Sequence, residues 1–252
     1  MAMFQVQSQL QHALAPTADE YLLELAQHQG PQALIWQSLP AIAVPRSYKR
    51  YAQLAHCQQH FAHQGWPIYV RQSGGGLVPQ GKGIINLSLS WRQFGRPLDY
   101  ADPAYELICT VIQKALRAQG ISSSAQAVQG SFCDGRFNLA VSIDQDYKKI
   151  VGTAQRWRRC APPTGATTTS VAGSAAAWHV ALVHAVILLE VDELQLNSLA
   201  NQVEHCLQSH KHYNATKIYS LHRLGLRPQA FLQALYDQLQ LTAVPHDQVC
   251  PL

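Results

Sequence analysis

The feature that most constrains this chain is a glycine-rich stretch at residues 71–83, which lies between two apolar segments. Its sequence is Arg-Gln-Ser-Gly-Gly-Gly-Leu-Val-Pro-Gln-Gly-Lys-Gly. Three consecutive glycines bury no side chain and cost backbone entropy, so packing does not explain them. They suit a sharp turn at which a ligand approaches the backbone closely. The stretch therefore predicts a substrate-binding loop between strands at 68–70 and 84–91.

The order of strand, glycine loop and strand excludes two nucleotide-binding motifs. In a P-loop or a dinucleotide-binding site a helix follows the glycines, and neither consensus is present here. Residues 84–91 instead alternate with a period of two, which is typical of a strand. Asn86 shares one predicted face of this strand with Ser88 and Ser90.

The remaining periodicity predicts an α+β fold with mixed, largely antiparallel sheets flanked by helices. Apolar residues at helical spacing predict helices at 20–29, 51–63, 102–119, 194–207 and 228–241, the first of them capped by Thr17 or Asp19. Strand-like runs occupy 33–36, 41–44, 125–129, 137–143, 149–157 and 178–189, with a turn at 144–147 and an exposed loop at 162–177. We expect a single domain over 1–252, with a core at about 17–208 and a helical C-terminal extension at 209–252.

Composition indicates a globular protein and excludes several classes. Of the 252 residues, 47% are hydrophobic and 13% are charged, and the net charge is +4. The chain has no basic run with interleaved aromatics that would predict nucleic-acid binding, and no apolar run long enough to predict a membrane span. The first 14 residues lack the order of a signal peptide. Together with six dispersed cysteines that form no CxxC pair, this predicts a cytoplasmic protein with reduced thiols.

A cysteine in a polar setting is the first candidate for chemistry. Cys133 lies between Gly130 and Gly135, beside Asp134 and near Arg136. A structural cysteine usually lies inside an apolar run, whereas a reactive thiolate needs access and a positive neighbour. Both interpretations stay open for Cys133 at this point.

A lysine and several histidines are further candidates. Lysines precede an apolar strand that has Gly152 at its middle, which suggests a cation held at the sheet, although a solvated hairpin end is the default for Lys148. His184 lies inside an apolar strand, where a hydrogen-bonded core histidine is commoner than a catalyst. The proximity of Cys206 to two later histidines is too loose for a zinc site, so no metal is expected.

Three motifs together resemble the lipoate/octanoate protein ligase and octanoyltransferase family, which has the biotin/lipoate A/B ligase fold. They are the Arg-Gln-Ser-Gly-Gly-Gly sequence at 71–76, the Lys-Ile-Val-Gly-Thr-Ala-Gln sequence at 149–155, and His184 on the following strand. Their order and spacing agree over about 17–208. The resemblance implies that Cys133 and Lys149 are catalytic. It implies a substrate site made of Arg71, Ser73, Gly74, Gly75, Gly76, Asn86, Gly152, Thr153, Ala154 and His184.

Two details resemble the cysteine-dependent octanoyl and lipoyl transferases of the family more than its ATP-dependent ligases. Ligases usually carry a histidine–acid pair after the glycines, where this chain has Pro-Gln-Gly at 79–81. They also carry a C-terminal accessory domain, for which too few residues remain after 208. The Ser-Phe-Cys-Asp-Gly sequence at 131–135 is similar to the cysteine motif of the transferases. Residues 83–89 are similar to the amidotransferase branch.

This resemblance implies a protein acyltransferase that moves an octanoyl or lipoyl group through a Cys133 thioester. The donor would be acyl carrier protein or a lipoyl-bearing protein, and the acceptor a lysine of a lipoyl domain of the dehydrogenase E2 or glycine cleavage H type. Basic residues such as Arg156 or Arg158 would meet an acidic lipoyl domain. No tightly bound cofactor is implied.

Two alternatives remain at this point. The first is an ATP-dependent lipoate ligase, in which ATP is a substrate. The second is a non-catalytic binder of lipoyl or biotinyl groups, which two departures from the family pattern keep open: Ala185 after the histidine, and Val44-Pro45 at the end of the second strand.

Overall fold

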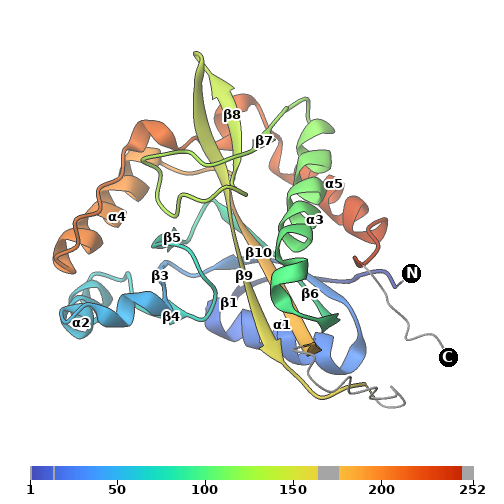
Figure 1. The fold of residues 1–252 in the computed structure, drawn as a ribbon. Coiled ribbons are helices and arrows are strands. Elements are labelled where there is room, and N and C mark those ends of the chain that lie inside the picture. Colours follow the sequence, from blue (N-terminus) through green and yellow to red (C-terminus); the bar gives the residue numbers. More distant parts are fainter. Residues whose placement is uncertain (1, 14, 164–175, 246–252) are drawn as a thin grey trace.

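Two mixed β-sheets form the centre of the molecule, and helices cover them (Figure 1). The structure is a computed structural model that describes residues 2–13, 15–163 and 176–245. The large sheet has the order β1 (Gln5–Ala13), β2 (Gln32–Ser38), β6 (Ile84–Gly95), β10 (Ala177–Leu188), β9 (Asp146–Arg159), β8 (Leu139–Ile143) and β7 (Ser124–Ala125). The small sheet has the order β4 (Ile68–Arg71), β3 (Ala41–Pro45) and β5 (Val78–Gln80).

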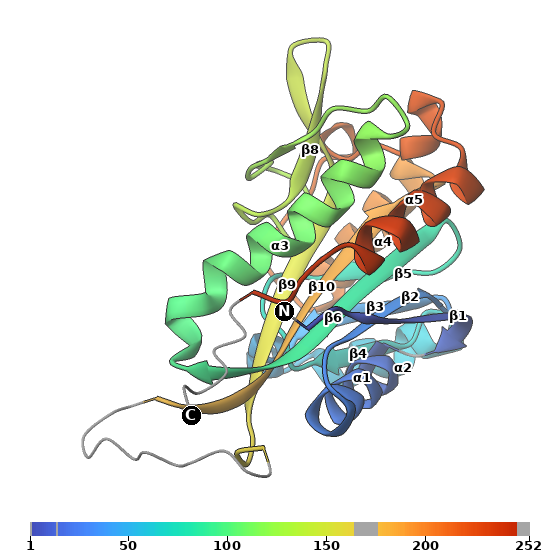
Figure 2. The same cartoon turned by 90° about the vertical axis from the view of Figure 1, so that its right-hand side faces the viewer.

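The strand pairing is largely antiparallel, and the α+β prediction is confirmed. The β1–β2 and β3–β4 pairs are parallel, whereas the other pairs of both sheets are antiparallel. β8 and β9 form a hairpin that projects beyond the helices (Figure 2). Its turn contains Asp144 and Gln145, which both have left-handed φ angles.

Five helices complete the layers: α1 (Ala15–Gln29), α2 (Leu54–His63), α3 (Pro97–Arg117), α4 (Glu193–Cys206) and α5 (Pro228–Gln240). Alternation along the central strands sends their side chains into two layers. In β2, Ala33 and Ile35 pack with α3 and α5, whereas Leu34 and Trp36 pack with α1. A third apolar cluster joins the small sheet to α2 and α4. The space between the two sheets therefore lies on the same side of the large sheet as α1.

The apolar face of α3 shows why the longest helix forms where it does. Ala104, Ile108, Val111 and Ile112 are buried at helical spacing against the large sheet. The helix begins at Pro97, and not at the predicted Asp102, because a proline suits the first turn, where its missing N–H is not needed. The second proline of this segment thus lies inside the helix.

Several other predicted boundaries are wrong, for reasons of tertiary context. β1 and β5 were not predicted, because neither the glutamine-rich first segment nor the Val-Pro-Gln run after the glycines has a strong strand pattern. The strand expected at 125–129 is reduced to Ser124–Ala125. Because α1 begins at Ala15, Asp19 lies inside the helix and does not cap it. Most of the loop expected at 162–177 falls outside the described residues.

A disulfide joins α2 to α4 through Cys57 and Cys206. The expectation that all the cysteines are reduced is therefore wrong for this pair. The two lie 149 positions apart in the sequence and meet because both helices pack on the small sheet, which no local spacing can signal. Cys109, Cys133 and Cys160 are free, and Cys250 lies outside the described residues. Among the described helices, none has the length and apolarity needed to cross a membrane.

Candidate active site

The cysteine loop that precedes β8 carries Cys133 in a strained and enclosed position. Cys133 has a φ of 50°, in the left-handed region that non-glycine residues rarely adopt. The residue is 9% exposed, and its Sγ accepts a hydrogen bond from the backbone N–H of Gly76 at 3.1 Å. A guanidinium nitrogen of Arg71 lies 3.9 Å from the same sulfur. Strained backbone of this kind is concentrated at functional sites, which supports the reactive interpretation of Cys133.

The glycine triplet packs against this cysteine loop. A Cβ at Gly75, whose φ is +100°, would lie 2.6 Å from the sulfur of Cys133. A Cβ at Gly76 would lie 3.1 Å from the Cys133 Cα, whereas one at Gly74 would meet nothing within 4 Å. The close approach expected for a ligand is thus, at two of the three glycines, an approach by the cysteine loop itself.

Arg71 fastens the glycine loop to the small sheet. Its side chain is 6% exposed and donates to the carbonyl oxygens of Gly74 at 2.7 Å and Gly76 at 2.9 Å. A longer bond of 3.5 Å reaches the carbonyl of Ala43 in β3. Because the same guanidinium faces the Cys133 sulfur, Arg71 places a positive charge at the thiol while it shapes the loop.

Lys149 is the second buried cation of the site. It is 1% exposed, and its Nζ donates to the carbonyl oxygens of Phe132 at 2.6 Å and Cys133 at 3.0 Å. Gly152 leaves room for this side chain, since a Cβ there would lie 2.9 Å from the Lys149 Nζ. The glycine was expected to admit a ligand, and its neighbour is instead the lysine. Lys148 donates to the carbonyl of Thr216, and its side chain is only 16% exposed, so the default prediction of a solvated hairpin end is wrong for this residue.

The two cations lower the pKa of the Cys133 thiol. Burial alone raises this pKa, but the charges of Lys149 and Arg71 together with the Gly76 N–H outweigh burial, so the pKa falls below the ordinary cysteine value. Burial lowers the pKa of Lys149 to about 8, although the neighbouring Cys133 acts in the opposite direction. By contrast, burial raises the pKa of Cys109 to about 12. Among the free cysteines that the structure describes, the electrostatics thus activate Cys133 alone.

A pocket opens between the two sheets beside Cys133. Eight of the predicted site residues line it: Arg71, Asn86, Cys133, Lys149, Gly152, Thr153, Ala154 and His184. Ser73 and the three glycines that follow it do not line the pocket, although Ser73 is buried nearby. The glycine loop therefore supports the cysteine loop more than it forms the pocket wall. Apolar side chains such as Val186 and Leu188 complete the lining.

Most polar side chains of the pocket already have partners. Asn86 and Gln80 exchange two hydrogen bonds, at 3.0 and 3.1 Å. The Nδ1 of His184 lies 3.3 Å from a carboxylate oxygen of Asp19 in α1. Thr153 donates to the carbonyl of Phe137. His184 is thus half-buried, as its strand position predicted, and faces the pocket.

Sequence reasoning missed a residue that orients the cysteine loop. Asn138 is buried and donates to the carbonyl of Cys133 at 3.1 Å, while its own oxygen faces the backbone N–H of Thr153. An asparagine five residues after a cysteine gives no recognisable signal. Tyr69 and Asp19 were missed in the same way, because only the fold brings them to the pocket.

A buried carboxylate fixes the tyrosine that packs against the cysteine loop. Glu204 in α4 is fully buried and accepts hydrogen bonds from Tyr48, Tyr213 and Ser209. The ring of Tyr213 meets the ring of Phe132 edge to face, with centroids 6.4 Å apart. Residues of the predicted C-terminal extension therefore support the loop that carries the thiol.

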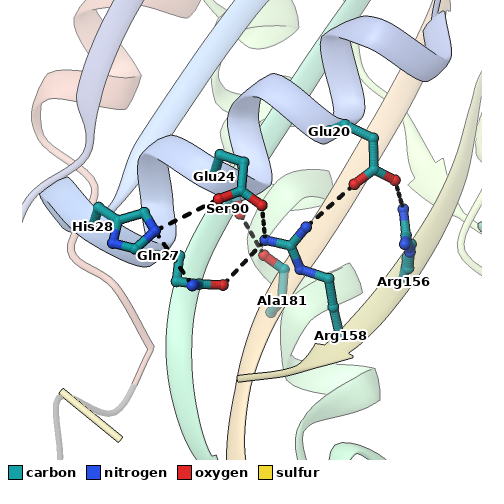
Figure 3. Close-up of polar contacts among 8 residues, drawn as sticks. All are labelled: Glu20, Glu24, Gln27, His28, Ser90, Arg156, Arg158 and Ala181. Atoms are coloured by element: carbon teal, nitrogen blue, oxygen red, sulfur yellow. Dashed lines mark hydrogen bonds and ion pairs between the residues drawn. The ribbon is translucent and has the colours of Figure 1, made fainter. Parts of the chain in front are cut away.

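The arginines expected to meet an acidic partner are engaged within the chain (Figure 3). Arg156 pairs with Glu20, and Arg158 pairs with Glu20 at 3.2 Å and with Glu24 at 2.9 Å. Their side chains are only 20% and 23% exposed. This neutralisation by α1 argues against the predicted role of Arg156 and Arg158 at a partner surface. Across the described ranges, no cluster of His, Cys, Asp and Glu suits a metal ion.

Comparison with known proteins identifies the family. The model of the lipoyl protein ligase A/B catalytic domain matches residues 12–240. An uncharacterized protein of Cupriavidus necator is 42% identical over 207 residues, which are 82% of this chain and 79% of the relative. The chain therefore belongs to the lipoyl protein ligase A/B catalytic domain family.

More distant relatives are similar to parts of the chain or to its fold. An octanoyl-[GcvH]:protein N-octanoyltransferase of Kyrpidia tusciae is 37% identical over 94 residues, which are 37% of this chain and 31% of the relative. A T. acidophilum protein solved with bound lipoic acid has a TM-score of 0.64 at 14% identity and covers 94% of this chain and 84% of its own. A lipoate-protein ligase A bound with ATP has a TM-score of 0.56 at 15% identity and covers 87% and 76%. The structural likenesses establish the fold alone.

Proposed function

We propose that this protein is an acyltransferase that moves an octanoyl or lipoyl group onto a lysine of a lipoyl domain through a thioester on Cys133. One observation carries the proposal: a thiol of lowered pKa, between two buried cations, lies at an apolar pocket. A thiolate is a strong nucleophile at neutral pH, and the pocket can shield an aliphatic chain from water.

In the first step the Cys133 thiolate attacks the acyl carbonyl of the donor. A carbon–sulfur bond forms, and the bond from the acyl carbon to the donor thiol or amine breaks. The Gly76 N–H and the Lys149 ammonium, which donate to the sulfur and the carbonyl of Cys133, are the proposed donors to charge that develops on the acyl carbonyl oxygen. A lysine of pKa about 8 can also give a proton to the departing group.

In the second step the amine of the acceptor lysine attacks the thioester. The carbon–nitrogen bond forms, Cys133 leaves as a thiolate, and the amine loses a proton. Neutral Lys149 can accept that proton, which returns the site to its starting state. The two steps need no ATP, because the donor already carries an activated or transferable acyl group.

The names of relatives suggest the partners. The Kyrpidia tusciae relative is named for transfer from an octanoylated glycine cleavage H protein, and a bipartite lipoate protein ligase of Thermoplasma acidophilum with a TM-score of 0.58 was studied with its E2 lipoyl domain. We therefore propose a lipoyl domain of either type as acceptor. An octanoylated H-type protein or acyl carrier protein is the proposed donor.

The decisive experiment mixes the protein with octanoylated donor in the absence of ATP and analyses intact mass and peptides. We expect a gain of one octanoyl group on the peptide that contains Cys133, and its transfer to an apo lipoyl domain. Cys133→Ala should abolish both events, whereas Cys160→Ala, a change at a free cysteine away from the pocket, should leave them unchanged. An octanoyl group that reaches the lipoyl domain without passing through Cys133 would refute the proposed mechanism.

A second function is favoured by the fold, because one structural neighbour is a ligase with bound ATP. In that case the lipoate carboxylate would attack the α-phosphate of ATP to give lipoyl-AMP and pyrophosphate, with Lys149 beside the phosphate and Cys133 dispensable. The same reaction mixture with free lipoate and ATP separates the two functions. Activity that survives Cys133→Ala and requires ATP would establish the ligase.

A further inference from the structure

The pocket has a polar end that lies away from Cys133. The strand register places Gly152 opposite Val186 beside the Lys149 side chain, and Ala154 opposite His184 one step further along. The small sheet agrees, because Arg71 touches the thiol while Tyr69 precedes it by two residues on β4. Two strand residues span about 7 Å. Tyr69, His184 and its partner Asp19 thus form the polar end of the pocket.

The hydroxyl of Tyr69 is an unpaired hydrogen-bonding group at this polar end. Its oxygen is shut off from solvent and has no hydrogen-bond partner among the described residues. The ring packs between the apolar cluster of the small sheet and the cluster under α1, so the side chain is held in place. A buried hydroxyl without a partner costs about 1–3 kcal/mol. Since Tyr69 lines the pocket, a ligand there can satisfy it in place of a water.

An acyl group on Cys133 extends toward this end. The small side chain of Ala154 leaves the floor of the pocket free beside His184, whereas the space at Gly152 is filled by the Lys149 side chain. An extended eight-carbon chain that starts at the thiol is longer than the roughly 7 Å of two strand residues, so its last carbons lie in the end of the pocket that Tyr69 lines. The two candidate acyl groups differ at those carbons, because octanoyl ends in a methyl group and lipoyl ends in a dithiolane ring.

Building on the proposed function, we propose that Tyr69, with His184 and Asp19, selects the lipoyl over the octanoyl group by donating a hydrogen bond to a dithiolane sulfur. Divalent sulfur is a weak acceptor, which suits a donor that is otherwise unpaired. A terminal methyl would leave the hydroxyl buried and unsatisfied. A site built around a polar contact discriminates against a ligand that lacks it.

The test compares three free acids by titration calorimetry: lipoic acid, 5-cyclopentylpentanoic acid and octanoic acid. The second acid has the shape of the first without its sulfurs, so the pair isolates the acceptor. We expect the wild type to bind lipoic acid roughly three- to tenfold more tightly than the cyclopentyl acid. Tyr69→Phe should remove that preference and leave the affinity for octanoic acid nearly unchanged. Tyr147→Phe, at an exposed tyrosine of β9, is the matched control.

The result that overturns the proposal is equal binding of lipoic acid and the cyclopentyl acid by the wild type. A Tyr69→Phe variant that weakens all three acids equally would also overturn it, because the hydroxyl would then act through packing. If none of the three acids binds, the pocket does not hold acyl groups, and the proposed selectivity is overturned as well. The Cys133 adduct is measured separately, so transfer through a thioester can fail while selectivity stands, and the reverse.

Discussion

Gly75→Ala tests whether the glycine triplet exists to admit the cysteine loop. The new methyl group would lie 2.6 Å from the Cys133 sulfur and 3.0 Å from the Arg71 guanidinium, whereas ordinary contact begins at 3.4 Å. The sulfur or the backbone of the glycine loop must therefore move by about 0.8 Å. A misplacement of about 1 Å can cost roughly 100-fold in rate. The φ of +100° adds backbone strain of about 1–3 kcal/mol for alanine.

The matched control is Gly74→Ala, in the same triplet. A methyl group there meets nothing within 4 Å, so we expect stability and activity close to wild type. The assay is the rate of octanoyl transfer, together with the rate at which iodoacetamide modifies the peptide containing Cys133. The second measurement needs no assumption about the substrate. If Gly75→Ala and Gly74→Ala were equally fast in both assays, the steric reasoning would be refuted.

Three further predictions concern the charge, the cross-link and the support of the site. Lys149→Met removes the strongest influence that lowers the pKa of Cys133, so this pKa should rise. The pH profile of thiol alkylation should then move to higher pH, and the rate at pH 7 should fall about tenfold for each unit of the rise. An unchanged profile would contradict the ion-pair account. Reduction of the Cys57–Cys206 disulfide should lower the free energy of unfolding by about 2–4 kcal/mol in urea titrations, and an identical midpoint with and without reductant would show that the bond does not form. Tyr213→Phe removes the hydroxyl that donates to the buried carboxylate of Glu204 but keeps the ring against the cysteine loop. The free energy of unfolding should fall by roughly 1–3 kcal/mol, with little change in the rate of thiol alkylation. A large loss of alkylation would assign the hydroxyl a role in positioning the thiol.

Local patterns in the sequence were sufficient for much of the architecture. The apolar spacing along α3 follows from burial of one face, whereas β6 is buried on both faces and its alternation separates apolar from polar side chains. Local sequence also made Cys133 a candidate, because this cysteine lies between glycines and beside charged residues. The three motifs could therefore be interpreted as one family before any contact was known.

What the glycines contact could not be inferred from the sequence. The triplet signals that something comes close to the backbone at 74–76, and only the fold decides that it is the cysteine loop. Gly152 is a parallel case, in which the neighbour is Lys149. A missing Cβ is a local property, whereas the identity of the atom that fills its place depends on residues far along the chain.

The tertiary structure alone decided the contacts between distant elements. Asp19 was interpreted as a helix cap and instead faces His184, 165 positions away. The arginine pair of β9 was assigned to a partner and is neutralised by α1, and Cys57 meets Cys206 across 149 positions. The sequence by itself determined which residues are chemically unusual. The packing of the two sheets with their helices determined which of those residues meet, because burial drives elements together without regard to their separation along the chain.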